Sequence, residues 1–150
     1  MPPVEPPDPN YTERVRASFA RQRLLVTLGA KLARVAPGEV EIHLPFREDL
    51  SQQHGFLHAG ALTSVVDTAC GYAALSLMPA GAAVLTVEFK VNLLAPGKGE
   101  VFVARGRVIK AGRTLSVVNG EVHALDGGEE KLVATMVATV MTVRDRGLTD

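Results

Sequence analysis

An apolar segment with a single charge, from His58 to Leu77, is the feature of this sequence that most constrains its fold. Between His58 and Glu88 the only charged side chain is Asp67, and apolar residues occupy every side of the helical wheel. A helix that is apolar all round is either wrapped by protein or embedded in a membrane. Because the segment contains Asp67 and lacks charged anchors at its flanks, a membrane span is disfavoured. We predict a central buried helix that ends before Pro79.

The rest of the chain has the pattern of one short helix and a set of strands. Residues 11–22 have apolar side chains four apart on one face, which is typical of a helix. Residues 32–35 and 40–44 alternate around an Ala36-Pro-Gly38 turn, as in a β-hairpin. Four Val- and Thr-rich stretches with turn signals between them follow the apolar helix, and we interpret them as an antiparallel meander. These stretches are residues 83–94, 100–110, 114–125 and 131–143.

The last of these stretches is apolar at both alternating sets of positions, so both of its faces need cover. The central helix can cover one face, and no second layer of the chain is left for the other. We therefore expect another subunit there. A long antiparallel sheet curled around one apolar helix is an α+β arrangement known as the hotdog fold, and the order of the elements fits it.

Composition and charge set the broad class of the protein. The 150 residues suffice for one domain, and 16 basic and 16 acidic side chains leave no net charge, which argues against a nucleic-acid partner. The single cysteine, Cys70, excludes an intrachain disulfide framework. We predict a disordered proline-rich arm over residues 1–9, the folded domain over residues 10–144 and a polar tail over residues 145–150. No apolar signal core is present near Met1, so a cytoplasmic location is expected.

Asp67 is the first candidate for chemistry. An unpaired carboxylate in the middle of an apolar helix costs several kcal/mol to bury. Asp67 is therefore paired with another group, exposed in a cleft or functional. Carboxylates with perturbed pKa values are concentrated at active sites. The structural alternative is a hydrogen bond from a hydroxyl one turn away, such as that of Thr63.

The start of this helix is the second candidate. The first backbone N–H groups of a helix favour negative charge, and the small residues Ala59 and Gly60 leave them open to a ligand, although tight packing would also explain small residues. Amides directed at a polarised carbonyl form an oxyanion hole. Asp67 lies roughly 12 Å further along the axis, so one carbonyl cannot touch both groups of one chain. Either the groups act separately, or two antiparallel copies of the helix share the site in an obligate dimer.

Residues 58–71, His-Ala-Gly-Ala-Leu-Thr-Ser-Val-Val-Asp-Thr-Ala-Cys-Gly, resemble the His-Gly-Gly…Asp helix signature of the PaaI-type hotdog acyl-CoA thioesterases. The similarity extends over residues 29–143 and includes Thr86-Val-Glu-Phe, Ala95-Pro-Gly97 and Gly112-Arg-Thr114. The resemblance implies hydrolysis of an aryl or fatty acyl-CoA to a free acid and coenzyme A, in a dimer with shared sites, and it points to a tetramer. No cofactor is expected, since coenzyme A belongs to the substrate. We also expect no nucleic-acid partner and no membrane partner.

The resemblance also implies roles for individual residues. Asp67 matches the family's helical carboxylate, which acts as nucleophile or as general base for water, and Gln52 matches the side chain that orients the water or the thioester. Ala59 stands where the family has a glycine whose N–H polarises the thioester carbonyl, and His58 beside it holds the turn. Thr86 matches a strand hydroxyl that assists the water. In the family, the amide and the glutamine come from one subunit and the carboxylate from its partner; Ala59 keeps the N–H, but its Cβ could narrow the approach of the acyl group.

A further set of residues is implied for the coenzyme A moiety. Lys98, Lys110 and Arg113 could meet its phosphates, and arginine suits bidentate phosphate contact. The alternative for residues 110–114 is an ordinary charged hairpin turn. The full set is Pro96, Gly97, Lys98, Lys110, Gly112, Arg113 and Thr114.

Two other functions remain open from the sequence. Hotdog hydratases and dehydratases use a histidine and an acid on hydroxyacyl thioesters, and a non-catalytic acyl-CoA-binding hotdog protein needs no reactive acid. His54 and His58 are four residues apart, but no strong third ligand is adjacent, so we expect no metal site.

Overall fold

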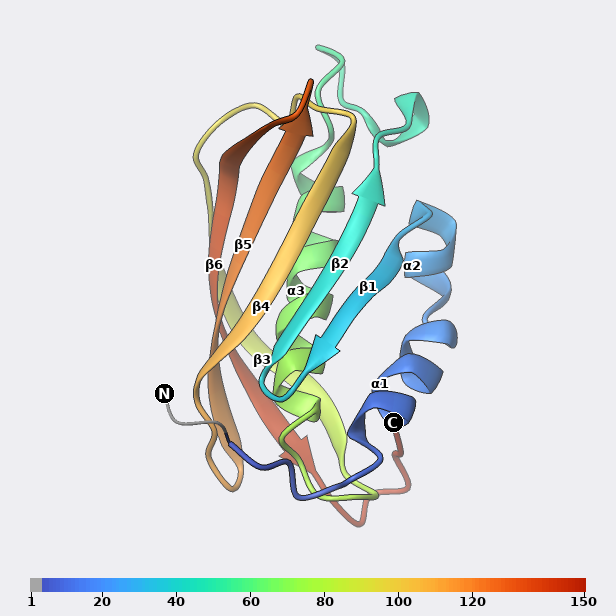
Figure 1. Ribbon diagram of the computed structural model, residues 1–150, viewed down its shortest axis with the longest axis vertical. Coiled ribbons are helices and arrows are strands. Elements are labelled where there is room, and N and C mark those ends of the chain that lie inside the picture. Colours follow the sequence, from blue (N-terminus) through green and yellow to red (C-terminus); the bar gives the residue numbers. More distant parts are fainter. Residues whose placement is uncertain (1–3) are drawn as a thin grey trace.

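One curved sheet and one long helix dominate the computed structural model, which describes residues 4–150 (Figure 1). Residues 1–3 of the expected proline-rich arm lie outside the described part. The elements in chain order are α1 (Tyr11–Ala20), α2 (Arg23–Leu28), β1 (Lys31–Ala36), β2 (Glu39–Pro45), a 3-10 turn (Glu48–Leu50), α3 (Ala59–Leu75), β3 (Ala83–Leu93), β4 (Val101–Lys110), β5 (Leu115–Asp126) and β6 (Glu129–Val143).

The sheet has six strands in the order β1-β2-β4-β5-β6-β3, and every neighbouring pair is antiparallel. α3 packs across one face of the sheet (Figure 1), which confirms the predicted α+β hotdog fold. The prediction of a four-stranded meander was wrong in one respect. β3 does not pair with β4 but lies at the far edge of the sheet beside β6. Alternation within a strand marks its two faces and not its neighbours, so the pattern could not reveal this crossing.

The predicted central helix is α3, which has 17 residues and ends two residues before the predicted Leu77. From Val65 to Leu75 every residue except Asp67 is buried, so protein surrounds this half of the helix. Among residues 4–150, no helix has both the length and the apolar character that crossing a bilayer requires.

The N-terminal region differs from its prediction as a single helix over residues 11–22. α1 ends at Ala20 and a separate short helix, α2, begins at Arg23, with Gln22 between them in an extended conformation. Within the expected proline-rich arm, Asp8 is buried. Its carboxylate accepts a 2.9 Å hydrogen bond from the Asn10 N–H and lies 3.4 Å from Arg14 Nε. This residue therefore anchors the start of α1.

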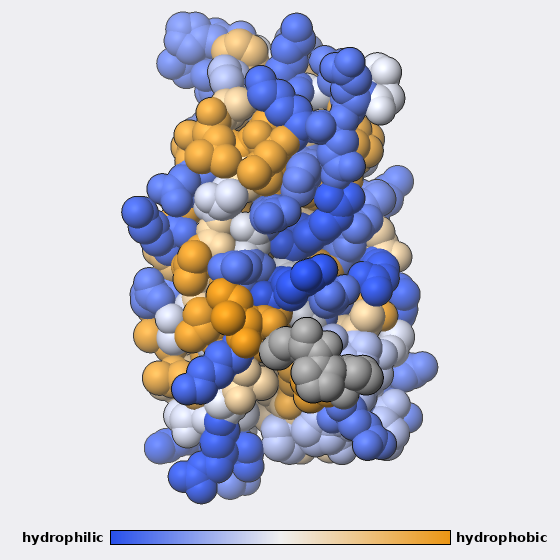
Figure 2. Space-filling model, turned by 60° about the vertical axis from the view of Figure 1, so that its left-hand side comes forward, coloured by the Kyte–Doolittle hydropathy of each residue, from blue (hydrophilic) through white to orange (hydrophobic). Residues whose placement is uncertain are grey.

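β3 is an edge strand with exposed apolar side chains. Leu85 and Val87 near its start are 50% and 52% exposed, and Leu93 at its end and Leu94 directly after it are 52% and 55% exposed. The molecule's surface in Figure 2 shows apolar side chains in two groups among polar ones. The adjacent β6 is apolar on both faces, as noted from its sequence, but the protomer buries only the inner face and leaves Val137 on the outer face 49% exposed. A long apolar edge is a template for pairing with another chain.

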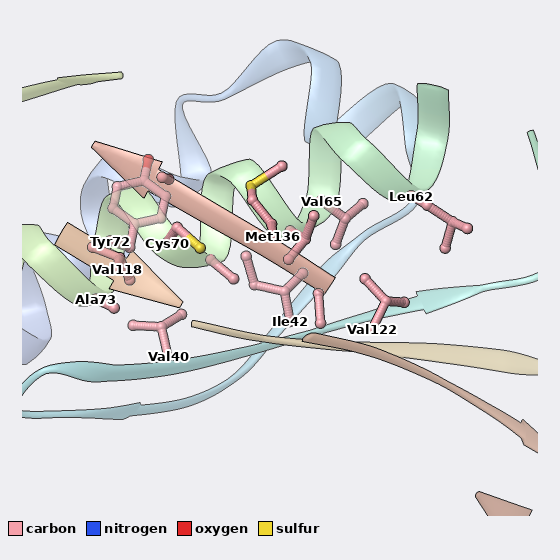
Figure 3. Close-up of a cluster of buried hydrophobic side chains, with 14 of the residues drawn as sticks. Val40, Ile42, Leu62, Val65, Cys70, Tyr72, Ala73, Val118, Val122 and Met136 are labelled. Carbon is pink, nitrogen blue, oxygen red and sulfur yellow. The ribbon is translucent and has the colours of Figure 1, made fainter. Parts of the chain in front are cut away.

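α3 approaches the sheet closely at two glycines. Gly106 of β4 and Gly120 of β5 are direct cross-strand partners beneath the helix. A Cβ on Gly120 would lie 2.6 Å from Val66 Cγ2 and 2.8 Å from Cys70 Sγ, and a Cβ on Gly106 would overlap the α3 backbone. Figure 3 shows Cys70 within the cluster of buried side chains that fills this interface. The two glycines thus set how deep the middle of α3 sits on the sheet.

Candidate active site

Asp67 projects from the middle of α3 toward the start of the edge strand β3. There Thr86 Oγ1 donates a 2.8 Å hydrogen bond to Asp67 Oδ1. Thr63, the partner that the structural alternative invoked, makes no side-chain hydrogen bond to any of residues 4–150. Thr86 is also the strand hydroxyl that the family resemblance singled out, and a register irregularity between Thr86 and Glu88 interrupts the β3–β6 pairing at this point.

The environment of Asp67 perturbs its ionisation. Burial raises the pKa of the Asp67 carboxyl above its ordinary value, and the hydrogen bond from Thr86 offsets part of that rise. One turn further along α3, burial raises the pKa of the Cys70 thiol to about 12. Cys70 therefore stays protonated at neutral pH and does not supply a thiolate nucleophile, which leaves Asp67 as the candidate reactive group in the middle of α3.

A small pocket of about 110 Å³ opens beside Asp67. Asp67 Oδ2, the second carboxylate oxygen, has no hydrogen-bond partner among residues 4–150. The pocket is lined by Gln22, Asp67, Thr68, Gly71, Tyr72, Val84 and Thr86. Gln22 and Tyr72 were not predicted as site residues. Gln22 carried no sequence signal of a site residue, because the helix predicted over residues 11–22 did not reveal the start of α2. Tyr72 could have been predicted, since it places a polar hydroxyl in an apolar helix five residues after Asp67.

The start of α3 presents one free amide. His58 caps the helix, since its Nδ1 accepts a 2.7 Å hydrogen bond from the Gly60 N–H. The His58 carbonyl accepts from the N–H groups of Ala61 and Leu62 at 3.0 and 3.3 Å. The Ala59 N–H has no partner within the part of the chain that the structure describes. It is therefore the amide of this turn that can donate to a ligand, and His58 holds the turn that presents it.

Gln52 lies close to the start of α3 with its amide in a fixed orientation. Its side-chain carbonyl accepts hydrogen bonds from the backbone N–H groups of His54 and Phe56 at 2.5 and 3.3 Å. Because these donors require the oxygen, the Nε2 group of Gln52 is left to donate elsewhere. Gln52 and Ala59 line one pocket of about 490 Å³, which is mainly apolar and includes residues from the end of β3. Its other lining residues are His54, Phe56, Leu57, Leu62, Leu93, Leu94, Ala95, Pro96 and Gly97.

The two halves of the predicted site are separate in one protomer. The Asp67 pocket includes Val84 and Thr86 at the start of β3, and the Ala59 pocket includes Leu93 and Leu94 at its end. No residue lines both pockets. A single protomer thus brings Asp67 and Thr86 together, and Gln52, His58 and Ala59 together, but it does not join the two groups.

The residues predicted for coenzyme A also form two groups. Pro96, Gly97 and Lys98 follow β3 beside the Ala59 pocket, and the Gly97 carbonyl accepts a 2.8 Å hydrogen bond from Leu57. Lys110, Gly112, Arg113 and Thr114 lie at the turn between β4 and β5, at the other end of β4. The charged side chains of both groups, Lys98, Lys110 and Arg113, are exposed and form no ion pair with any other residue of the described range 4–150.

An antiparallel sheet wrapped around one helix, with an acid on the helix and an open amide at its start, is the architecture of the hotdog thioesterases. The Thioesterase superfamily model matches residues 54–131. The chain belongs to this superfamily.

Individual known proteins extend this similarity. A thioesterase family protein from Silicibacter pomeroyi is 54% identical, with a TM-score of 0.88, over 89% of this chain and 98% of that one. The PaaI protein from the phenylacetic acid degradation operon of Escherichia coli is 21% identical and shares the fold, with a TM-score of 0.81 over 89% of this chain and 94% of that one. A medium/long-chain acyl-CoA thioesterase of Escherichia coli is 29% identical over 57% of this chain and 61% of its own length. The superfamily match, the Silicibacter pomeroyi protein and the medium/long-chain acyl-CoA thioesterase support thioester hydrolysis as the activity.

Proposed function

We propose that this protein is a PaaI-type acyl-CoA thioesterase, which hydrolyses its substrate in a site shared between two protomers. The observation that carries the proposal is the position of two complementary groups at opposite ends of one edge strand. Asp67, bound to Thr86, lies at the start of β3, and the free Ala59 N–H lies near its end. Each half lacks what the other provides.

Pairing of two β3 strands would complete the site. In an antiparallel pair the start of one strand lies beside the end of the other, so the partner's Asp67 pocket comes next to the Ala59 pocket. The exposed apolar side chains of β3 supply a reason to associate. A second pairing through the outer face, where Leu115, Val137 and Met141 are exposed, would extend the dimer to a tetramer.

The chemistry follows from the groups in each half. The Ala59 N–H donates to the thioester carbonyl oxygen and stabilises the negative charge that develops on it, and Gln52 Nε2 lies in the same pocket as a second donor. The partner's Asp67 either attacks the acyl carbon or takes a proton from the water that attacks it. The carbon–sulfur bond breaks, the sulfur keeps the electron pair and gains a proton, and a free acid and coenzyme A leave. As proposed, the reaction uses no metal or redox cofactor.

The coenzyme A phosphates would bind the exposed basic groups. Lys98 and the pair Lys110 and Arg113 lie at opposite ends of β4, as do the two halves of the catalytic site along β3. A single nucleotide can therefore contact both basic groups only if two protomers contribute.

Release of free thiol from acyl-CoA, followed with dithiobisnitrobenzoate over aryl, short-chain and long-chain substrates, tests the proposal. A hydrolase releases one thiol per acid formed and loses this activity in Asp67→Asn. A hydratase would change the absorbance of a 2-enoyl-CoA without releasing thiol, and a binding protein would retain acyl-CoA without turnover. Either result would replace the proposed function.

A further inference from the structure

Tyr72 stands at the centre of a hydrogen-bond chain beside the Asp67 pocket. It is 2% exposed, and Figure 3 shows its hydroxyl directed away from the other labelled core side chains. The hydroxyl lies 2.9 Å from Ser18 Oγ on α1 and 3.0 Å from Gln22 Nε2. Ser18 Oγ in turn lies 2.8 Å from Asp150 Oδ1. Four side chains from three distant parts of the sequence thus form one hydrogen-bonded chain, which ends at the pocket with Gln22.

The direction of each hydrogen bond in this chain is determined. A carboxylate only accepts hydrogen bonds, so the Ser18 hydroxyl donates to Asp150, and Ser18 Oγ must then accept from the Tyr72 hydroxyl. The Tyr72 oxygen accepts from the Gln22 amide N–H, because its own proton is already used. Asp150 also accepts a 2.7 Å hydrogen bond from the Val84 N–H, which ties the chain to the start of β3.

This direction fixes the orientation of the Gln22 amide. With Nε2 held by Tyr72, the carbonyl oxygen Oε1 points the other way, and it has no partner among residues 4–150. Gln22 and Asp67 line the same pocket, in which Asp67 Oδ2 is also without a partner within this range, since Thr86 occupies Oδ1. A polar pocket of about 110 Å³ has room for water.

We propose that Gln22 is a further catalytic residue, on the basis of the hydrolase function proposed above. A water molecule in the pocket donates one O–H to Asp67 Oδ2 and the other to Gln22 Oε1, which leaves a lone pair of its oxygen free for the acyl carbon. As the new carbon–oxygen bond forms, the proton on the Asp67 side passes to the carboxylate and the sulfur departs with the carbon–sulfur electron pair. If Asp67 instead attacks first, the same water attacks the acyl carbon of the acyl–Asp67 anhydride, the bond between that carbon and the Asp67 oxygen breaks, and the departing Asp67 carboxylate takes the proton that the water loses.

Tyr72 is a positioning residue in this arrangement. Its hydroxyl touches neither Asp67 nor the substrate but keeps the Gln22 carbonyl, rather than the NH₂ group, available to the water. Without the hydroxyl, the amide can rotate and present a donor where an acceptor is needed. Loss of the Tyr72 hydroxyl should therefore lower kcat less than loss of the Gln22 amide itself.

The test compares Gln22→Met, which keeps the side-chain length but removes both polar groups, with the unsubstituted protein. We expect kcat to fall by about 10- to 100-fold with KM unchanged, and by the same factor for short and long acyl-CoA substrates, because every substrate uses the same water. Tyr72→Phe should give a smaller loss of kcat, again without a change of KM. Tyr11→Phe, which removes a hydroxyl of the first turn of α1, is the matched control and should keep full activity.

An unchanged kcat in Gln22→Met would overturn the proposal. So would a loss that grows with acyl-chain length and appears in KM, since Gln22 would then be a wall of the acyl pocket. If Gln22→Met does not fold, Tyr72→Phe tests the proposal instead. An unchanged kcat, or a loss that grows with acyl-chain length and appears in KM, would overturn it. Absence of thiol release by the unsubstituted protein would instead refute the hydrolase function, independently of Gln22.

Discussion

Thr86 donates a 2.8 Å hydrogen bond to Asp67 and thereby joins the edge strand β3 to the middle of α3. The bond satisfies only one oxygen of the Asp67 carboxylate, and no cationic side chain among residues 4–150 forms an ion pair with that carboxylate. Burial and this single hydrogen bond act on the ionisation of Asp67 in opposite directions, and burial is the larger effect. The fold therefore does not stabilise the ionised form of Asp67, which is typical of carboxylates at functional sites.

Removal of the Thr86 hydroxyl should shift the pH dependence of activity. The hydrogen bond lowers the pKa of Asp67, so in Thr86→Val that pKa rises further. The proposed reaction needs ionised Asp67, and the acidic limb of the kcat/KM profile should therefore move to higher pH. Thr86→Ser keeps the hydroxyl and should retain the original limb. A limb that stays in place or moves to lower pH in Thr86→Val would show that Asp67 is not the titrating group.

Asp67→Asn should abolish activity without weakening the fold. The amide oxygen can still accept from Thr86, but the residue can neither attack nor take a proton, so we expect a loss of at least about 100-fold in kcat. The pKa of Asp67 is raised in the folded state, which means that ionised Asp67 costs stability above that pKa and costs none below its unfolded pKa. Thermal unfolding at neutral pH should give an equal or higher Tm for Asp67→Asn, with the difference vanishing in acid. A clearly lower Tm at neutral pH would contradict this view.

The fold was largely predictable because its main signals are local. One charge in an apolar helix marked α3, and glycine-containing turns between Val- and Thr-rich stretches marked β4, β5 and β6. The position of β3 was not predictable, because its pairing with β6 depends on how the connection crosses the sheet rather than on the alternation of its own residues.

The candidate site was predictable where residues lie close in sequence or match a known signature. His58 and Ala59 at the start of α3 and Asp67 within it belong to one continuous segment. Gln22 reaches the Asp67 pocket from a break between two helices 45 residues earlier, a position with no periodic signal. The chain from Gln22 to Asp150 depends on tertiary contacts alone, so only the structure shows it.

A methyl group on either sheet glycine should destabilise the protein. The Cβ of Gly120→Ala would overlap Val66 and Cys70, and that of Gly106→Ala would overlap the α3 backbone, so α3 must move outward. We expect a loss of about 1–3 kcal/mol in the free energy of unfolding, measured by urea denaturation. Gly71→Ala is the control, and it should instead raise the free energy of unfolding. Its Cβ would meet no atom within 4 Å, and alanine favours the helix by about 0.5–1 kcal/mol. Equal effects at Gly71 and Gly120 would refute the close approach.

Ala59→Pro should remove the proposed oxyanion donor while preserving the helix. Ala59 is the first residue of α3, where proline is well tolerated, and His58 before it has the extended conformation (φ −62°, ψ 135°) that proline requires. The substitution deletes only an N–H that has no partner among residues 4–150. We expect kcat to fall by about 100- to 1000-fold with little change in Tm. Ala59→Gly, which keeps the N–H, should remain active, and an active Ala59→Pro would exclude this amide from catalysis.

A mixed assembly of two inactive variants should recover activity if the site is shared. Co-expression of Asp67→Asn and Ala59→Pro chains with different tags allows purification of assemblies that contain both. In such a dimer, the intact amide of the Asp67→Asn chain faces the intact acid of the Ala59→Pro chain, so one site works and the other does not. We expect about half of the unsubstituted activity per dimer, because a two-fold interface creates two equivalent sites. The homodimers of each variant are the controls and should stay inactive. If acid and amide acted within one protomer, each chain would carry one defective site, and the mixed dimer would be as inactive as its parents.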